Sequence, residues 1–151
     1  RSGRRSALGL FALIDRQPKI DAEAPTGRHR DTGDGTIEFQ NVSFRFPHRR
    51  EQRVLQHVSF RAERGQTVAL VGTSGSGKST AVQLLLRFYD PVQGAVKVGG
   101  VDLRCFDLAW WRRQVGLVGQ EPVLFDVSLE DNVRYRCPEA TRAEIEAATR
   151  E

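Results

Sequence analysis

Gly72, Gly77, Lys78 and Ser79 are the residues whose types and spacing point most directly to chemistry. They match G-x-x-x-x-G-K-S/T, a pattern in which the backbone N–H groups of a glycine-rich turn surround phosphate oxygens. The Lys78 ammonium can then reach the β- and γ-phosphates of a nucleotide, and the Ser79 hydroxyl can bind Mg²⁺. A chance match at four fixed positions is expected at roughly a few starting points in 10⁵. We therefore predict a phosphate-binding loop at residues 72–80, with a fortuitous strand-turn-helix as the alternative.

Two flanking elements must hold such a loop. Residues 67–71 form a short apolar run that is typical of a strand, and residues 80–89 have a helix-forming pattern. The helix begins near Lys78, so its unpaired N–H groups and the positive end of its dipole add to the attraction for phosphate. A second apolar run at residues 115–118 predicts another parallel strand. Ligands lie at the carboxyl ends of such strands, so Gln120 could reach the same phosphates; a loop glutamine without a role is the alternative.

An antiparallel sheet is predicted on either side of the loop in sequence. Apolar residues alternate from residue 37 to residue 46, with a slip of one position near Gln40 that indicates a β-bulge or a bend into a second sheet layer. A second alternating run covers residues 58–62. Residues 94–103 predict a β-hairpin with Gly99-Gly100 at its turn.

Three short helices are predicted in the second half of the chain, two of them from capping signals. The helix without such a signal covers residues 106–113. Ser128 stands at the start of another, with Asp131 three residues later, and Thr141 with Glu144 forms a capping box for a third.

The first 35 residues differ in character from the rest. Residues 6–16 place apolar side chains at helical spacing, and Pro18 ends the run, which predicts a short amphipathic helix. Residues 21–34 are polar and contain several Gly and Pro residues, so we predict a linker there. Residues 1–35 are therefore predicted to precede a domain that begins at residue 36.

The composition excludes several classes of protein. The 151 residues are 39% hydrophobic and 28% charged, the balance of a globular domain. These residues contain neither a run of about 18 apolar residues, which a membrane span requires, nor a signal peptide. The net charge of +4 comes from basic residues that are spread among acidic ones without interleaved aromatics, so we do not expect nucleic-acid binding.

Cysteine and histidine usage gives no sign of a metal or redox site. Cys105 and Cys137 lack C-x-x-C spacing, so we expect reduced thiols that fill packing positions. The three histidines have no partner at ligand spacing. The chain contains no Met, and the helix that starts at Thr141 has no stop signal before Glu151; both observations lead us to expect an internal fragment.

The order of these segments resembles the nucleotide-binding domain of ATP-binding cassette (ABC) exporters, best in the multidrug (P-glycoprotein-like) and peptide exporter branch. The resemblance covers nearly the whole chain. It implies an α/β fold, namely a P-loop NTPase of the ABC type with a RecA-like core and an antiparallel β subdomain, truncated before the signature motif and Walker B. The segments that carry it are NVSFRFP, VLQHVSF, GQTVALVGTSGSGKSTAVQLLLRFYDP and VGLVGQEPVLFDVSLEDNV, while LFALIDRQPKID resembles the connector from the last membrane helix.

The resemblance implies a site for ATP and Mg²⁺. The aromatic residue of the family's A-loop falls on Phe46, which would stack on adenine. The glutamine of its Q-loop falls on Gln120, which would contact Mg²⁺ together with Ser79. The Walker A loop supplies the remaining site residues: Gly72, Thr73, Ser74, Gly75, Ser76, Gly77, Lys78, Ser79 and Thr80.

Some positions depart from the family's pattern. Phe46 stands where the family usually has Tyr, so the ring is kept and the hydroxyl is lost. Gly119 replaces a usual Ser beside Gln120, and this change bears on how the Q-loop is coupled to the membrane domain. The remaining departures do not touch the phosphates: Gly99, Asp131 and Arg136.

The family's signature LSGGQ, its Walker B aspartate and catalytic glutamate, and its switch histidine are not in this sequence, so no catalytic residue is assigned. The resemblance implies a parent transporter that hydrolyses ATP to export a substrate, at the cytosolic face of a membrane. Its partners would be a second nucleotide-binding domain and the transmembrane domain, against which residues 121–132 would lie. The 151 residues alone are expected to bind ATP and Mg²⁺ at most, because the groups that position water are missing.

Two alternatives belong to other classes. The first is a stand-alone truncated nucleotide-binding module without transport or ATPase activity. The second is a small phosphate-loop kinase, which would not be expected to carry both Phe46 and the segment VGLVGQEPVLF. For the isolated chain we expect weak folding, with apolar residues around Val68, Leu70 and Val118 facing water. The transported substrate is not encoded in these residues.

Overall fold

The computed structural model describes residues 11–21, 30–49, 51–121 and 123–150. The chain forms two compact units, residues 1–116 and residues 117–151. None of the helices in the described ranges is long and apolar enough to cross a membrane.

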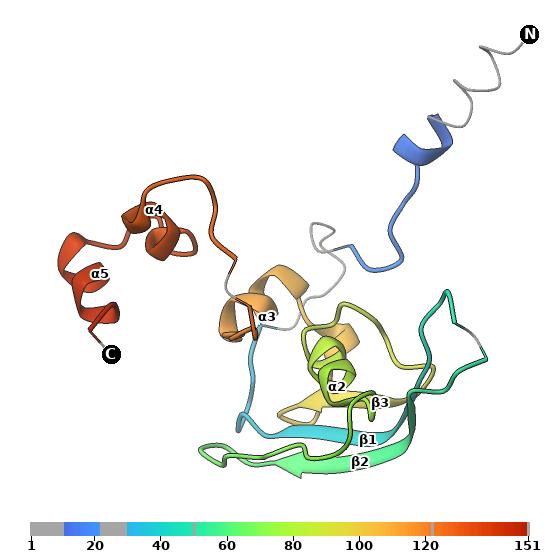
Figure 1. Cartoon of the computed structure of the whole chain (residues 1–151). Coiled ribbons are helices and arrows are strands. Elements are labelled where there is room, and N and C mark those ends of the chain that lie inside the picture. Colours follow the sequence, from blue (N-terminus) through green and yellow to red (C-terminus); the bar gives the residue numbers. More distant parts are fainter. Residues whose placement is uncertain (1–10, 22–29, 50, 122, 151) are drawn as a thin grey trace, which may run out of the picture. The chain divides into compact units, whose positions relative to one another are not determined.

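The first unit is built on an antiparallel sheet. Its strands are β1 (Ile37–Phe44), β2 (Leu55–Ala62), β3 (Gln93–Val98) and the short β4 (Val101–Asp102), in the order β2-β1-β3-β4. Strand β1 therefore runs between β2 and β3, as Figure 1 shows. The predicted antiparallel sheet is confirmed.

The predicted β-bulge in β1 is also confirmed. The register of β1 against β2 shifts between Phe39 and Val42, and Asn41 has a φ of 50°. Strand β3 approaches the bulge so closely that a Cβ at Gly94 would lie 2.3 Å from the carbonyl oxygens of Gln40 and Asn41. Only glycine fits at that position, because its φ of 82° is also in the left-handed region.

The β3-β4 hairpin turns at Gly99 and Gly100, as predicted. Val98 pairs with Val101 across the turn, and the two glycines have φ values of 54° and 79°. Two positive φ values at the central positions are what a tight two-residue hairpin turn requires.

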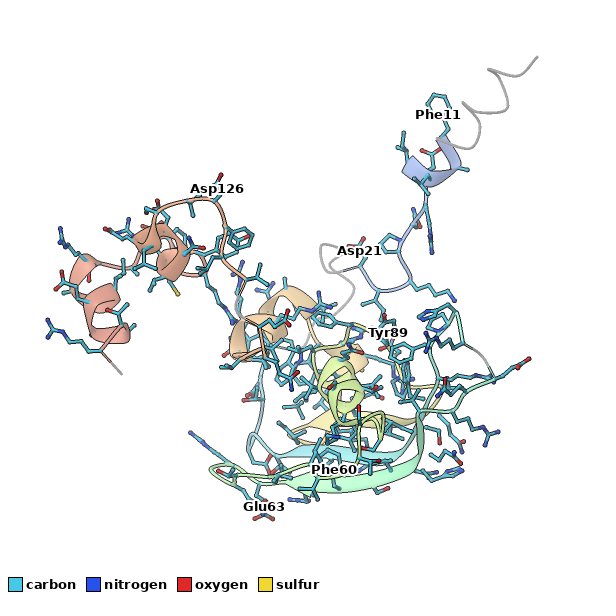
Figure 2. The ribbon with its side chains drawn as sticks, in the orientation of Figure 1. Phe11, Asp21, Phe60, Glu63, Tyr89 and Asp126 are labelled. Atoms are coloured by element: carbon cyan, nitrogen blue, oxygen red, sulfur yellow. The ribbon has the colours of Figure 1, made fainter. Side chains whose placement is uncertain are left out.

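Helix α2 (Lys78–Leu85) lies over one face of this sheet (Figure 1). It is followed by the 3₁₀ turn η1 (Leu103–Cys105) and by α3 (Leu108–Gln114), close to the predicted helix at residues 106–113. Phe60 on β2, labelled in Figure 2, stacks on Phe39 with their ring centroids 4.4 Å apart. The core combines residues of the sheet, α2, η1 and α3: Phe39, Val42, Phe44, Leu55, Ala81, Leu84, Val96, Val98, Leu103, Phe106, Leu108 and Trp111.

The prediction of parallel strands at residues 67–71 and 115–118 is wrong for this structure, since neither segment forms a strand. A parallel strand needs hydrogen-bonded neighbours and cover on both faces, and the four described strands pair only antiparallel with one another. The apolar residues therefore face solvent: Val68 is 39% exposed, Leu70 40% and Val118 98%. This exposure confirms the expectation stated for these three residues.

Helix α2 begins at Lys78, as predicted, with Gly77 at the N-cap position. It ends at Leu85, earlier than the predicted pattern over residues 80–89. The end is fixed by Arg87, whose φ of 51° takes the backbone into the left-handed region and stops the helix. Of the predicted helix at residues 6–16, residues 6–10 lie outside the described ranges, and residues 11–14 are helical.

The second unit contains α4 (Leu129–Arg134) and α5 (Arg142–Ala148). The hydroxyl of Ser128 accepts a hydrogen bond from the Asp131 N–H, and Thr141 and Glu144 form the full capping box, so both predicted caps are confirmed. Ile145 is the one apolar side chain that is buried among the described residues of this unit.

Both cysteines are free, but the prediction that they fill packing positions is wrong, because both are exposed. Cys105 ends the single turn η1 at the surface, and Cys137 follows α4, where little core is available.

Candidate phosphate-binding site

The loop at residues 72–77 is packed closely against the start of β2. Gly77, the N-cap of α2, is buried and has a φ of 96°. A Cβ on this residue would lie 2.5 Å from Cδ2 of Leu55 and 3.2 Å from the carbonyl oxygen of Val54. The position therefore requires glycine both for its backbone conformation and for lack of space.

Lys78 is held by the loop itself. Its Nζ donates hydrogen bonds to the carbonyl oxygens of Gly72 at 2.9 Å and Thr73 at 2.8 Å, and to Oγ of Ser76 at 3.4 Å. These contacts place the ammonium over the turn that precedes α2. Carbonyl and hydroxyl oxygens can be exchanged for phosphate oxygens, which accept from the same donor more strongly because they are charged.

The amino end of α2 offers further donors. No side chain caps this end, and the first turn contains no acidic residue. The N–H of Ala81 donates to the Gly77 carbonyl at 2.9 Å, which is the first hydrogen bond of the helix. The N–H groups of the preceding residues therefore have no carbonyl partner within the helix. Ser79 is exposed in this turn, whereas Thr80 is buried. The chemistry of this donor set fits a phosphate group.

Phe46 lies two residues beyond the end of β1 and is supported by other rings. Its ring meets those of Phe44 and Tyr89 edge to face, with centroids 5.1 and 5.4 Å away, and that of His48 at 5.7 Å. Figure 2 shows Tyr89 among the side chains beside α2. Phe46 also lines a cavity of about 680 Å³. A ring that is held by its neighbours loses little freedom on stacking with a flat ligand.

Backbone contacts connect the surroundings of Phe46 with the loop. The N–H of Val54 donates to the carbonyl of Phe44 at 2.9 Å, and Val54 in turn lies against Gly77. The first unit therefore joins two of the three predicted parts of the site, the aromatic residue and the loop, through one short series of contacts.

Gln120, the third part, belongs to the second unit, where it is exposed in a bend. Gly119 beside it has no close neighbour that a side chain would displace, because the nearest atom to a Cβ there is 3.6 Å away. Gln120 and the loop therefore belong to different units, and the role of Gln120 in the site stays a prediction.

Sequence reasoning missed the contacts at the far end of α2. Trp111 and Arg112 of α3 donate hydrogen bonds to backbone carbonyls at residues 85–87. A tryptophan followed by an arginine on a short helix has no distinctive spacing, so the sequence carries no signal for this contact. The residues of this contact could be identified only from the tertiary structure.

The geometry agrees with comparisons to known proteins. The family model described as "ABC transporter" matches residues 55–151. The chain is 47% identical over 148 residues to ABC transporter B family member 21 of Arabidopsis thaliana, which covers 98% of this chain and 11% of that protein. It is 49% identical over 129 residues to ATP-binding cassette sub-family B member 5 of Homo sapiens, over 85% of this chain and 10% of that protein.

A solved structure has a similar fold. The chain superposes on a bacterial Atm1-family ABC exporter with ATP bound, with a TM-score of 0.87 at 34% identity, over 99% of this chain and 26% of that one. The likeness agrees with the predicted α/β fold class of an ABC-type P-loop domain. This chain spans about a tenth of the length of the curated relatives, with 11% and 10% covered. The family model, the relatives and the solved structure agree: the chain belongs to the ABC transporter family.

Proposed function

We propose that the chain binds ATP with Mg²⁺ through the loop at residues 72–80. The observation that carries this proposal is the glycine loop that holds Lys78 at the start of α2, where no side chain caps the helix. Phe46 stacks on adenine in this proposal, and the backbone N–H groups of the loop hold the phosphates. The proposed ATP-binding residues are Phe46, Gly72, Thr73, Ser74, Gly75, Ser76, Gly77, Lys78, Ser79, Thr80 and Gln120.

The metal ion would be held mainly by oxygen atoms of the nucleotide. Within the described ranges, no cluster of three or more His, Cys, Asp or Glu residues could hold a metal by itself. Mg²⁺ retains water and phosphate oxygens and needs only one or two protein ligands, for which we propose Ser79 and Gln120. The ion neutralises phosphate charge when bound.

We further propose that the parent protein is an ATP-hydrolysing exporter. ABC transporters are generally ATPases, and relatives include a multidrug resistance protein homolog of Drosophila melanogaster. Residues 1–35 would be the connector from a transmembrane domain, and residues 36–151 the N-terminal part of the ATP-binding domain at the cytosolic face. Its partners would be that transmembrane domain and a second nucleotide-binding domain.

Titration calorimetry of the 151-residue chain with ATP and Mg²⁺ tests the binding proposal. We expect Lys78→Ala to weaken binding by about 10- to 100-fold, because hydrogen bonds from a charged group to the phosphates are lost. Lys97→Ala is the matched control, since Lys97 lies on β3. Equal affinity of Lys78→Ala and wild type would contradict the proposed site.

A phosphate-release assay on the same samples tests the proposal that this chain binds without hydrolysis. We expect no magnesium-dependent release above background, because no residue of this sequence is assigned as the general base. Turnover that Lys78→Ala abolishes would show that the chain supplies a base of its own.

A further inference from the structure

The carboxyl end of α2 is closed by a backbone motif of its own. Arg87 adopts a left-handed φ of 51°, and its N–H donates to the Leu84 carbonyl at 3.0 Å. The N–H of Phe88 donates to the Gln83 carbonyl at 2.9 Å. This pair of bonds is a Schellman motif, with arginine where glycine is usual. It satisfies the carbonyls of residues 83 and 84 and leaves those of the next three residues to find other donors.

All three of those carbonyls accept hydrogen bonds from α3. Nε1 of Trp111 donates to the Leu85 carbonyl at 2.8 Å. The guanidinium of Arg112 donates through Nε to Leu86 at 3.0 Å and through Nη2 to the Arg87 carbonyl at 2.9 Å. Two adjacent side chains of α3 therefore complete the hydrogen bonding at the end of α2.

Arg112 is held in this position by its two hydrogen bonds and by a contact with an aromatic ring. Its guanidinium carbon lies 4.9 Å from the centre of the Phe88 ring, within the range of a cation–π contact. Burial lowers the pKa of Arg112, and the nearby Arg87 charge lowers it further. An arginine remains protonated at neutral pH despite such a shift, so its positive charge faces the negative end of the α2 dipole.

The clamp formed by Trp111 and Arg112 joins the far end of α2 to α3. Helix α2 has eight residues and is about 12 Å long, and its other end is the phosphate-binding loop. Helix α3 ends at Gln114, six residues before Gln120. Trp111 and Arg112 therefore hold the end of α2, the helix that begins at the loop. They belong to α3, the helix that is followed by the segment leading to Gln120.

We propose that Arg112 is a positioning residue that transmits nucleotide occupancy of the loop to the segment that follows α3. This inference rests on the proposed binding of ATP at residues 72–80. Bound phosphate restrains the start of α2, and a rigid helix passes that restraint to its far end. Because Trp111 and Arg112 fix that end to α3, the restraint extends to residues 115–119.

Hydrogen exchange of the 151-residue chain, with and without ATP and Mg²⁺, tests the inference. We expect nucleotide to slow exchange at residues 115–119 in wild type by about 2- to 30-fold. In Arg112→Gln this response should disappear, while ATP still binds with at most a modest loss of affinity. Arg113→Gln is the matched control, because Arg113 is the exposed neighbour on the same helix, and it should keep the full response.

Arg112→Lys covers the case in which Arg112→Gln does not fold, as judged by circular dichroism. Lysine keeps the charge but cannot donate to both carbonyls in the fork geometry of arginine, so we expect a reduced response. A wild-type response in Arg112→Lys, or in a folded Arg112→Gln, would overturn the inference. Amides of β1 serve as the internal reference, since a general loss of stability would raise exchange there as well.

Two outcomes in wild type separate this inference from the proposed function. ATP binding without any change of exchange at residues 115–119 would overturn the inference alone. No ATP binding at all would overturn the proposed function, and the inference with it.

Discussion

Gly77 and Lys78, two adjacent residues of the proposed phosphate-binding loop, have different roles in its structure. The missing side chain of Gly77 lets the loop pack on Leu55 and Val54, and the long side chain of Lys78 returns over the same turn. A side chain at Gly77 would have to displace Leu55 or the backbone, and a shorter side chain at position 78 would lose the contacts with Gly72 and Thr73. The loop is therefore defined by packing as well as by the phosphate binding that we propose for it.

We predict that Gly77→Ala destabilises the first unit more than Gly75→Ala does. Both positions have a positive φ, 96° and 80°, so both variants carry the cost of a left-handed alanine, about 1–2 kcal/mol. A Cβ at Gly75 meets nothing within 4 Å, whereas one at Gly77 meets Leu55 at 2.5 Å. The clash should add about 1–3 kcal/mol to the free-energy loss. Equal urea midpoints for the two variants would show that the loop can relax away from β2.

These loop residues could be predicted from the sequence because each requirement is local. A glycine at a positive φ and a lysine at the start of a helix leave a fixed spacing in the chain. The contacts of Trp111 and Arg112 with α2 connect residues that are 26 and 25 positions apart. No spacing rule relates such residues, so they could be found only in the folded structure.

At the scale of elements, α3 depends on a cap that also pairs with a distant residue. Oδ1 of Asp107 accepts from the Trp110 N–H at 2.9 Å, and Oδ2 accepts from Nη2 of Arg30 at 2.6 Å. The hydrogen bond from the Trp110 N–H holds the pKa of Asp107 below its usual value, and Arg30 lowers it further. The cap is thus strongest when the carboxylate is ionised.

This shift gives a pH dependence with a definite sign. A carboxyl group with a lowered pKa in the folded state stabilises the fold fully above its unfolded pKa, about 4, and this contribution declines as the pH falls through the lower folded value. Asparagine can still cap a helix but does not titrate. We therefore predict that wild type has a higher Tm than Asp107→Asn at pH 7, and that the difference shrinks between pH 4 and pH 3.

Thermal unfolding of both proteins across this range measures the effect. The other carboxylates of the chain lower both curves, so the quantity of interest is the difference in Tm between the two proteins at each pH. A difference that stays constant from pH 7 to pH 3 would show that ionised Asp107 contributes nothing beyond a neutral cap.

Sequence patterns predicted some elements well and others poorly. The Gly99-Gly100 hairpin and the capping box at Thr141 were predicted because they depend on side chains close in sequence. The runs at residues 67–71 and 115–118 are not strands. An apolar run indicates that a segment tends to be buried, but it does not show whether a neighbouring strand is present to pair with it. The end of α2 was misplaced because a left-handed arginine at residue 87 is not an expected stop signal.

At the scale of the whole molecule, the two units are unequally stabilised. The first unit has a core that draws on the sheet, α2 and α3. In the second unit, Ile145 is the one buried apolar side chain among the described residues, and exposed apolar residues include Leu124, Leu129 and Val123 at 70%, 72% and 80%. Such an exposed group is what a further protein surface would cover.

We predict that the second unit opens well before the first when the isolated chain is heated. Helices α4 and α5 have six and seven residues, far below the length at which an isolated helix is stable in water. Their caps at Ser128 and Thr141 each contribute about 1 kcal/mol, which cannot replace a core. Residue-resolved hydrogen exchange as a function of temperature should therefore show α4 and α5 unprotected while β1 and β3 remain protected. The same protection in all four elements, lost in one sharp transition, would mean that the chain folds as a single cooperative unit and that the exposed apolar residues cost it little.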